Sequence, residues 1–574
     1  MNFLRKFPQT FWVANSMEIF ERMAWYGFYA VSSLYITGSA ATGGLGLSSE
    51  QRGIIQGIIP FLLYLLPVVT GALGDKFGYK RTFFIAYAIM TPAYFLLGRP
   101  DGFWGFFFVF LLVAIGAATF KPVVVGTVSH VTTEDTKALG FGIFYMMVNV
   151  GGFAGPLVAG LVRNELGWPW VFNMSAIWIG CNFIWLMIFY REPEQRSRAL
   201  KEEIAATASR VDANAPTQAV STAAQNLWAA ALRLGPVFML GGWLIDWKAA
   251  GVALGLLVLV AMLLRVIALV VPREVRVLLG KSGEDIVEVI GNPAFFVVTL
   301  GTVFVLMLAG GNWIRWSDFG LLAAILIGSN LAIDGVLRRG ATQRVGLWAP
   351  ARIGDWRFVL YLLLLSGFWT EFNQLFITMP EYIRDYTDTH DLLRSLATAC
   401  GVLGLGGWQA GIQGWIDTGR QVNPEWLVNI DAGAIVVLQV IISSAFAKWK
   451  PFTTMIVGTI ITGIGLAVGA YGTHGWIVAA SIFIFAIGEM MASPKAQEYV
   501  SRIAPPAKTA MYMGYFFVAV ALGNLFGGIL SGQMYGHFGR DVKDPQTMWL
   551  IFGAIGIGTA GLLWIYDRLV VRAR

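Results

Sequence analysis

The chain is divided into apolar segments of about 20 residues, and this pattern constrains its fold more than any other feature. A helix needs about 20 mostly apolar residues to cross the hydrocarbon layer of a membrane. Only 13% of the 574 residues are charged, about half the share of a soluble domain. The sequence therefore predicts an all-α polytopic membrane protein. The predicted spans lie near 11–37, 53–74, 82–98, 104–128, 140–162, 169–190, 227–246, 248–271, 293–310, 316–337, 357–382, 428–447, 453–472, 476–496, 509–533 and 546–567.

These spans form three groups along the chain. We expect an N-terminal six-helix bundle over 1–190, a cytoplasmic linker over 191–226 and inserted hydrophobic helices over 227–345. A C-terminal six-helix bundle over 346–574 completes the chain and contains a long outer loop at 383–427. The insert is predicted to hold two to four spanning helices. The apolar patch in the outer loop is expected to rest on the membrane.

Basic residues orient the predicted spans. Lys80 and Arg81 follow the second span, and Arg191 follows the sixth. Because cytoplasmic loops carry the excess of Lys and Arg, both termini are predicted to be cytoplasmic, in an inner or plasma membrane. The net charge of +7 therefore indicates membrane orientation rather than nucleic-acid binding, and the lipid bilayer is the expected partner. In the first half of the chain, the loops on the opposite side of the membrane hold only three basic residues, Arg52, Arg99 and Arg163.

Two six-helix halves joined by a cytoplasmic linker resemble the major facilitator architecture, in which one half rocks against the other around a central site. The stretch GALGDKFGYKR, from Gly71 to Arg81, resembles the cytoplasmic loop motif of that superfamily. The resemblance implies that Asp75, Lys80 and Arg81 act as a conformational gate. The alternative is a basic turn that only sets the topology.

The first span carries three charged residues, Glu18, Glu21 and Arg22. Their spacing places them on one helix face, which Tyr26 and Tyr29 continue. Each charge at the middle of a membrane costs about 2.5–3.5 kcal/mol, so this face is predicted to line an aqueous cavity and to carry protons. The alternative is a static ion-pair cluster that only locks helices together.

Two further ionisable residues interrupt later spans. Lys121 precedes a proline in the fourth span. If that span faces the first, the charge of Lys121 and the three charges of the first span sum to zero. We expect Glu18 to pair with Arg22, which leaves Glu21 for Lys121 across the cavity. Glu489 lies about 13 residues into its span, near mid-membrane at a rise of about 1.5 Å per residue. It is predicted to face substrate, and the alternative is a carboxylate that reaches interfacial water.

Other motifs give no support for catalysis. Gly556, Gly558 and Gly561 match GxGxxG, but they lie inside an apolar span with no strand before it, so close helix packing is the better interpretation. The same interpretation applies to Gly151xxxGly155 and Gly523xxxGly527. The chain contains no P-loop, CxxC or HExxH motif. We therefore expect no enzyme, no catalytic residues, no metal and no cofactor beyond the proton as a coupling ion.

Glu18-x-x-Glu21-Arg22 followed by Trp25-Tyr26-Gly27 resembles the ExxERxxYYG motif in the first helix of the proton-dependent oligopeptide transporter (POT/PTR) family, a branch of the major facilitator superfamily. Three further stretches carry the same resemblance in the same order, and together they cover 11–190 and 357–567. They are Tyr64-Leu-Leu-Pro67 with Gly71 and Gly74-Asp75; Lys121-Pro122 with Phe144-Tyr145-Met-Met-Val-Asn149-Val-Gly151-Gly152; and Glu489, Ser493-Pro494, Glu498-Tyr499, Ala504-Pro505 and Gly523-Asn524.

The resemblance implies proton-driven import of di- and tripeptides or peptide-like small molecules. Lys121 would attract the carboxylate of such a substrate, while Glu489 and Asn149 would receive its amino end. The implied coupling residues are Glu18, Glu21, Arg22, Lys121 and Glu489. The implied substrate-binding residues are Tyr26, Tyr29, Tyr64, Lys121, Tyr145, Asn149, Asn373 and Glu489.

The chain departs from the family pattern in the residues that contact substrate. Tyr29 stands where peptide carriers place an Arg, and Asn373 stands where the seventh helix has an acidic residue. Glu371 is two positions away, about 200° around a helix, and Asp431 stands near the usual Asn of the eighth helix. These changes bear on specificity and leave the proton cluster intact.

Two other functions are consistent with the sequence. The first is a carrier or exporter of a non-peptide organic solute or anion, and the second is a membrane sensor that does not transport. A small-molecule substrate is expected, and the sequence indicates no obligate protein partner.

Overall fold

The structure is a computed structural model that describes residues 7–67, 70, 78–133, 135–192, 232–237, 239, 292–349, 356–504 and 509–571. It divides into two compact units, each considered by itself below. The first unit comprises Met1–Pro67, Phe83–Arg191 and Trp356–Arg574, and the second comprises Val68–Thr82 and Glu192–Asp355. The predicted spans at 227–246 and 248–271 lie almost wholly outside the described residues, as does the predicted linker.

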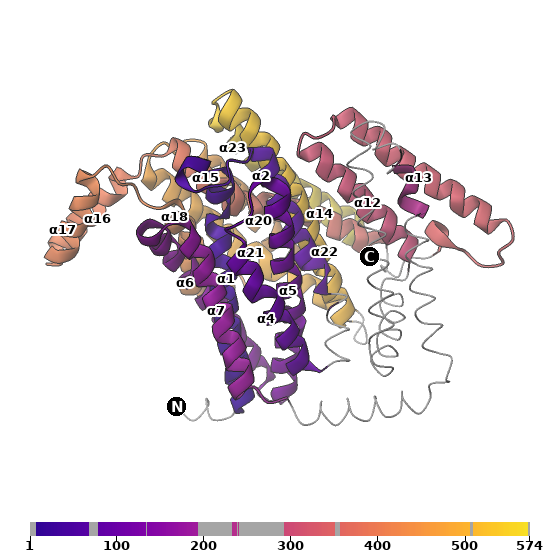
Figure 1. The fold of residues 1–574 in the computed structure, drawn as a ribbon, viewed down its shortest axis with the longest axis horizontal. Helices are drawn as coiled ribbons and strands as arrows, with labels where there is room; N and C mark the ends of the chain where they lie inside the picture. Colours follow the sequence, from indigo (N-terminus) through magenta and orange to yellow (C-terminus); the bar gives the residue numbers. More distant parts are fainter. Residues whose placement is uncertain are drawn as a thin grey trace. The chain divides into compact units, whose positions relative to one another are not determined.

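The described elements are helices (Figure 1), which confirms the predicted all-α class. Before residue 192 they are α1 (Gln9–Thr37), α2 (Ser49–Leu65), α4 (Tyr79–Leu96), α5 (Gly102–Val131), α6 (Lys137–Leu166) and α7 (Trp168–Phe189). From residue 356 they are α14 (Trp356–Ile377), α15 (Met379–Tyr386), α16 (His390–Val402), α17 (Gly406–Asp417), α18 (Pro424–Val428), α19 (Ile430–Ala445), α20 (Pro451–Gly469), α21 (Gly475–Ile503), α22 (Thr509–Met534) and α23 (Pro545–Tyr566). Short helical turns occupy Ala40–Thr42, Gly346–Trp348, Tyr535–Asp541 and Asp567–Val571.

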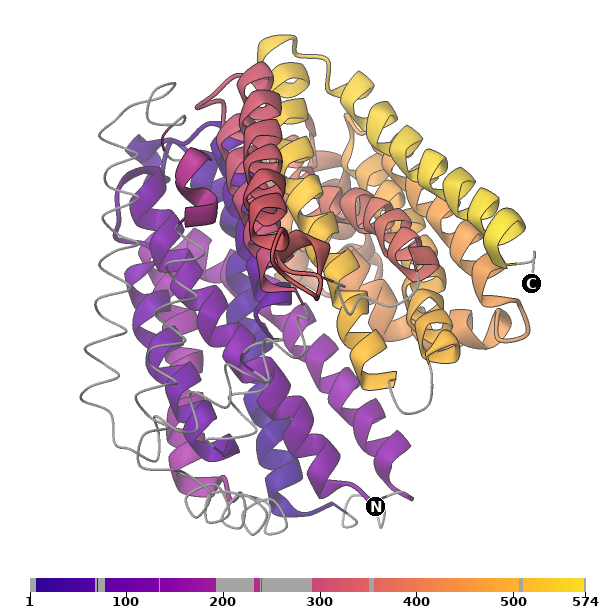
Figure 2. The ribbon, with the colours of Figure 1, turned by 90° about the vertical axis from the view of Figure 1, so that its right-hand side faces the viewer.

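Within the part of the chain that is described, nine helices are long and apolar enough to cross a membrane. The N-terminal helices of the first unit gather on one side and the C-terminal helices on the other (Figure 2). We refer to these two groups as the N-half (α1, α2 and α4–α7) and the C-half (α14–α23).

A close crossing of α2 and α22 joins the two halves. Ser48 and Gln51 form a capping box that fixes where α2 begins, since Ser48 Oγ and Gln51 Oε1 each accept a backbone hydrogen bond at 3.2 Å. One turn later, a Cβ atom at Gly53 or Gly528 would overlap with the backbone of the opposite helix. Such contacts require glycine, because any side chain would separate the helices.

A second crossing holds α6 against α1. A Cβ atom at Gly155 would lie 2.7 Å from the carbonyl oxygen of Met23, and one at Gly151 would lie 2.6 Å from that of Ile19. The packing predicted for this glycine pair is therefore confirmed. The same prediction is wrong for Gly558 and Gly561, where no described atom lies within 4 Å of an added Cβ.

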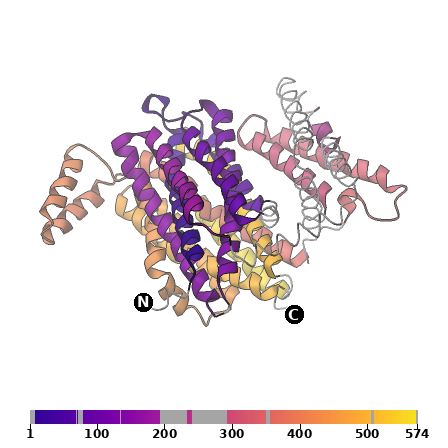
Figure 3. The ribbon, with the colours of Figure 1, turned by 60° about the horizontal axis from the view of Figure 1, so that its bottom comes forward.

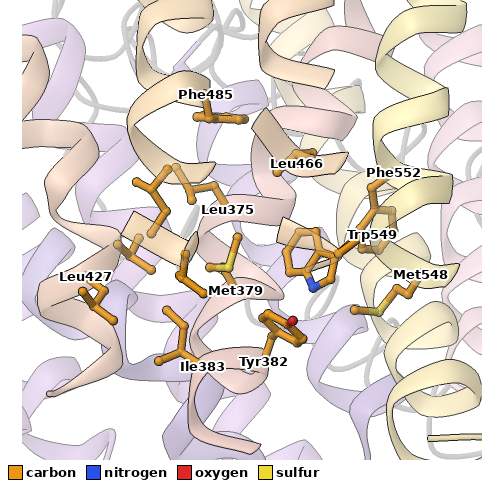
Figure 4. Close-up of a cluster of buried hydrophobic side chains, with 14 of the residues drawn as sticks. Leu375, Met379, Tyr382, Ile383, Leu427, Leu466, Phe485, Met548, Trp549 and Phe552 are labelled. Carbon is orange, nitrogen blue, oxygen red and sulfur yellow. The ribbon is translucent and has the colours of Figure 1, made fainter. Parts of the chain in front are cut away.

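The span predicted at 357–382 is two helices. α14 ends at Ile377 and α15 begins at Met379 with a proline in its first turn, because proline fits the start of a helix and cannot continue one. Apolar side chains from both helices pack with those of α18, α20, α21 and α23, as Figure 4 shows. They include Leu375, Met379, Tyr382, Leu427, Leu466, Phe485 and Trp549. This cluster fixes the position of Glu381 in α15.

The segment predicted as a long loop, 383–427, is largely helical. Helices α16 and α17 form a hairpin that projects from the rest of the C-half (Figures 1 and 3). The backbone N–H and side chain of Thr389 donate to Gln421 Oε1 at the base of the hairpin, at 2.7 and 2.8 Å. Trp408 is 71% exposed, so the apolar patch recognised in the sequence lies on the surface of this hairpin.

The second unit contains α12 (Pro293–Gly310) and α13 (Trp316–Arg338), which match the predicted stretches at 293–310 and 316–337. They pack through apolar residues such as Val305 and Leu326. Asp334 is fully buried, and its carboxylate pairs with Arg233 at 2.6 Å. The ion pair explains how α13 keeps an acidic residue on its buried face.

Gly528→Ala should destabilise the protein by about 1–3 kcal/mol, because the new methyl group forces apart two backbones in contact. The matched control is Gly558→Ala, where the added Cβ meets no described atom and alanine should be neutral or stabilising. Thermal unfolding of the purified variants checks this. Equal melting temperatures for the two variants would contradict the close crossing.

Candidate functional site

A cavity of about 250 Å³ lies between the N-half and the C-half of the first unit. Helices α1, α2 and α6 supply one side of its wall, and α14, α18, α19, α21 and α22 supply the other. Seven of the eight residues predicted to bind substrate line it. They are Tyr26, Tyr29, Tyr64, Tyr145, Asn149, Asn373 and Glu489.

The three charges of α1 form one buried cluster. Arg22 Nε lies 3.1 Å from Glu18 Oε1, and the Arg22 guanidinium also contacts the carboxylate of Glu21. Glu21 is 1% exposed, and its Oε1 atom accepts no hydrogen bond from a described residue. Arg22 also lies over the ring of Tyr26, 5.8 Å from its centroid, and Tyr26 faces the cavity. The cluster therefore adjoins the cavity through Arg22 and Tyr26.

Lys121, the eighth predicted residue, is not part of the cavity wall. Its ammonium group lies over the ring of Tyr64, 4.6 Å from the ring centroid, which is cation–π range. The sequence analysis predicted that Glu18 pairs with Arg22 and that Glu21 pairs with Lys121. The structure differs, because Arg22 forms ion pairs with both carboxylates. A guanidinium presents five donors in a fork and serves two carboxylates more readily than an ammonium does.

Asp431 and Glu489 bring two carboxyl groups together in the C-half. Asp431 is in the first turn of α19 and Glu489 is in the middle of α21, and both line the cavity. Their side chains lie within hydrogen-bonding range of each other. The sequence singled out each of them, but their proximity depends on how α19 packs against α21.

Glu371 points away from the cavity, although it lies only two residues from Asn373. It is buried between α14, α20 and α23, beside Gly463 and Gly556. Glu371 therefore does not take the place of the acidic residue that Asn373 replaces, as its angle around the helix predicted.

Beyond one end of the cavity, the two halves are joined by an ion pair that the sequence did not reveal. Arg52 Nε on α2 lies 2.8 Å from Glu381 Oε1 on α15, and both side chains are completely buried. Arg52 also donates to the carbonyl oxygen of Ile377 at 3.3 Å and to the hydroxyl of Ser531. Glu381 Oε2 lies 3.4 Å from Arg540 and 3.8 Å from Arg384.

A second seam between the halves runs from α6 to α18 at the same end. Arg163 lies 3.0 Å from the buried carboxylate of Glu425, which also lines the cavity. Beside it, Asn164 donates to Asn423 at 3.0 Å, and Asn429 donates to the carbonyl oxygen of Phe153 at 2.8 Å. From the sequence, Arg52 and Arg163 could be recognised only as basic residues of outer loops. Their acidic partners, Glu381 and Glu425, lie more than 250 residues further along the chain.

The residues predicted to form a conformational gate are only partly described. Asp75 lies outside the described residues. Lys80 and Arg81 are in the first turn of α4, whose start is capped by Glu192: the backbone N–H groups of Tyr79 and Lys80 donate to its carboxylate at 2.7 and 3.4 Å. The gating role of these residues remains a prediction.

Comparison with known proteins identifies the architecture. The sequence profile of the Major Facilitator Superfamily matches residues 17–223 and 407–573. The chain belongs to this superfamily. It is therefore a multi-pass membrane transporter rather than an enzyme, and the predicted fold class is confirmed.

Two of the relatives of this chain are peptide transporters. The chain is 22% identical over 545 residues to the peptide transporter YePEPT of Yersinia enterocolitica subsp. palearctica serotype O:3 (strain YE-P4), covering 90% of this chain and 86% of that protein. It is 32% identical over 165 residues to the di-/tripeptide transporter of Lactococcus lactis subsp. lactis (strain IL1403), covering 28% of this chain and 33% of that protein. The chain is thus a homologue of the POT family, as its motifs predicted.

The fold agrees with solved structures over nearly the whole chain. A POT family transporter crystallised in complex with 5-aminolevulinic acid aligns with a TM-score of 0.60 at 14% identity, covering 98% of this chain and 99% of that one. At this identity, the likeness establishes the fold alone.

Glu381→Gln should destabilise the protein by about 3–5 kcal/mol, because it leaves the buried Arg52 without its charged partner. The matched control is Glu165→Gln, which removes an exposed ion pair between the halves: Glu165 lies 3.6 Å from Arg420 and its side chain is 70% exposed. An exposed pair of this kind contributes about 0–1 kcal/mol.

Thermal unfolding in detergent measures both effects. The double variant Arg52→Leu/Glu381→Leu should recover most of the lost stability, because it removes both charges together. A double variant no more stable than Glu381→Gln would show that the ion pair is not the source of the loss.

Proposed function

We propose that this protein is a proton-coupled symporter that imports di- and tripeptides or peptide-like small molecules by alternating access. In this proposal both termini are cytoplasmic, and the end of the cavity nearer to Arg52 and Glu381 faces outward. The observation that carries the proposal is the buried cluster of Glu18, Glu21 and Arg22, which adjoins the cavity.

The charge balance of the cluster supports proton coupling. Two carboxylates share a single guanidinium, so one negative charge remains in a membrane-embedded site. Binding a proton removes that charge, and Lys121 offers a competing positive charge from α5. Glu18 Oε2 and Glu21 Oε1 both lack a hydrogen-bond donor among the described residues, so either carboxylate can receive the proton, and this proposal assigns it to Glu21. A proton at Glu21 weakens its attraction to Arg22 and so alters the cavity wall at Tyr26.

The position of the cavity supports alternating access. It lies where the two halves meet, and toward one end of it the halves are joined by two ion pairs: Arg52 with Glu381, and Arg163 with Glu425. Rocking of one half against the other would break these contacts and open that end.

The substrate class rests on the relatives and on the composition of the wall. The homologues named above are transporters of peptides. The wall combines aromatic rings such as Tyr26, Tyr64 and Tyr145 with amide and carboxyl groups such as Asn149 and Glu489. This combination suits a small amphipathic molecule with a charged amino end.

Glu21→Gln should lower proton-driven uptake at least tenfold, because the substituted amide cannot bind and release a proton. Labelled dialanine and, in parallel, labelled dialanine amide are supplied to proteoliposomes under an inward proton gradient, with and without a protonophore. The matched control is Glu371→Gln, which replaces a buried carboxyl group outside the cavity with an amide and should retain uptake.

Protonophore-sensitive uptake that survives in Glu21→Gln would contradict the role of Glu21 in coupling. Absence of uptake by the unmodified protein would favour the other two functions, a carrier of a non-peptide solute or a membrane sensor.

A further inference from the structure

The wall of the cavity carries acidic side chains and, among the described residues that form it, no Lys, Arg or His. The acidic members are Glu425, Asp431 and Glu489. The guanidinium of Arg163 lies 3.0 Å from the carboxylate of Glu425, and this ion pair balances its charge. Asp431 and Glu489 form no ion pair with a Lys, Arg or His among the described residues, so any charge that this part of the wall presents to a ligand is negative.

The two remaining carboxyl groups leave hydrogen-bonding capacity unused. Asp431 is 2% exposed. Neither its Oδ1 atom nor Glu489 Oε2 accepts a hydrogen bond from a donor group of the described residues. Two carboxylates held this close repel each other unless a proton or a cation lies between them. An ammonium group carries three N–H donors and one positive charge, and thus supplies what both oxygens lack.

On the opposite side of the cavity, the described residues present no free cationic group to a ligand carboxylate. Lys121 is directed to the ring of Tyr64 and does not form part of the wall, and Arg22 is engaged by Glu18 and Glu21. Tyr29 contributes a phenol, whose hydroxyl donates to the carbonyl oxygen of Gln56 at 3.4 Å. A buried anion without a cationic partner is strongly disfavoured.

The remaining wall is aromatic and favours positive charge. Trp25, Tyr64, Tyr145, Trp369 and Phe372 all line the cavity. The faces of such rings attract cations, by about 0.5–2 kcal/mol in other proteins. Charge and aromatic lining therefore select the same class of ligand.

We propose that the cavity selects organic cations: peptide-like molecules with a charged amino group and no free carboxylate, with Asp431 and Glu489 acting together as the counter-ion. This inference rests on the proposed function, since it narrows the substrate class of the same cavity. It assigns Asp431 as a specificity-determining residue that contacts the ligand's amino group.

Three molecules with the same backbone test the proposal by equilibrium binding to the purified full-length protein in detergent. Dialanine amide is a cation, dialanine is a zwitterion and N-acetyl-dialanine is an anion. The amide should bind at least tenfold more tightly than dialanine, a difference of about 1.4 kcal/mol. N-acetyl-dialanine should bind most weakly.

Asp431→Asn removes one charge of the pair and keeps its size. It should reduce the preference for the amide over dialanine to less than threefold, whereas Asp431→Glu should retain the preference. The matched control is Glu371→Gln, which replaces a carboxyl group of the same half, outside the cavity, with an amide and should leave the preference unchanged.

The outcomes separate this inference from the proposed function. Equal binding of dialanine and its amide, or tighter binding of dialanine, overturns the inference and leaves peptide transport standing. A preference for the amide that is unchanged in Asp431→Asn overturns the role of the carboxyl pair. Failure of all three molecules to bind overturns the proposed function and this inference together.

Discussion

The pairing of Arg22 with two carboxylates of its own helix is the interaction on which the site depends. A helix that carries three charges in its middle cannot face lipid, because each charge would lose its hydration without replacement. α1 is therefore enclosed by its neighbours, and the glycines of α6 bring one of them close enough to cover the charged face. Tyr26 and Tyr29, which follow the charged residues on the same helix, line the cavity. The charged cluster and the cavity are thus two results of the same constraint.

Much of the fold could be predicted because membrane insertion imposes a simple rule on sequence. Segments of about 20 apolar residues must be helices, and the described helices fall where the predicted spans lie. The exceptions arise where proline or a polar turn interrupts an apolar run. The span at 357–382 is divided at Thr378, and the predicted loop at 383–427 contains helices of its own. The domain boundaries predicted at 191, 227 and 346 remain predictions.

The site was predictable to the extent that its chemistry stands out against an apolar background. Glu21 and Glu489 were found because a charge inside a span is costly, and the tyrosines of the cavity were found because they continue a charged face or a family motif. The ion pair of Arg52 and Glu381 could not be found in this way, since each residue lies near a helix end where charge is ordinary. Only the packing of α2 against α15 and α22 shows that both are completely buried. The pairing of Asp431 with Glu489 depends in the same way on the tertiary fold.

The crossing of α2 and α22 has a mechanical consequence. Because Gly53 and Gly528 bring backbone against backbone, there are no side chains at the contact whose rotamers must change when the angle between the helices changes. Tilting is therefore cheap there, whereas pulling the helices apart loses the whole contact. Arg52 is adjacent to this point and holds the neighbouring α15 through Glu381. The crossing thus has the properties of a pivot between α2 and α22. The ion pair beside it restrains tilting about that pivot until the ion pair breaks.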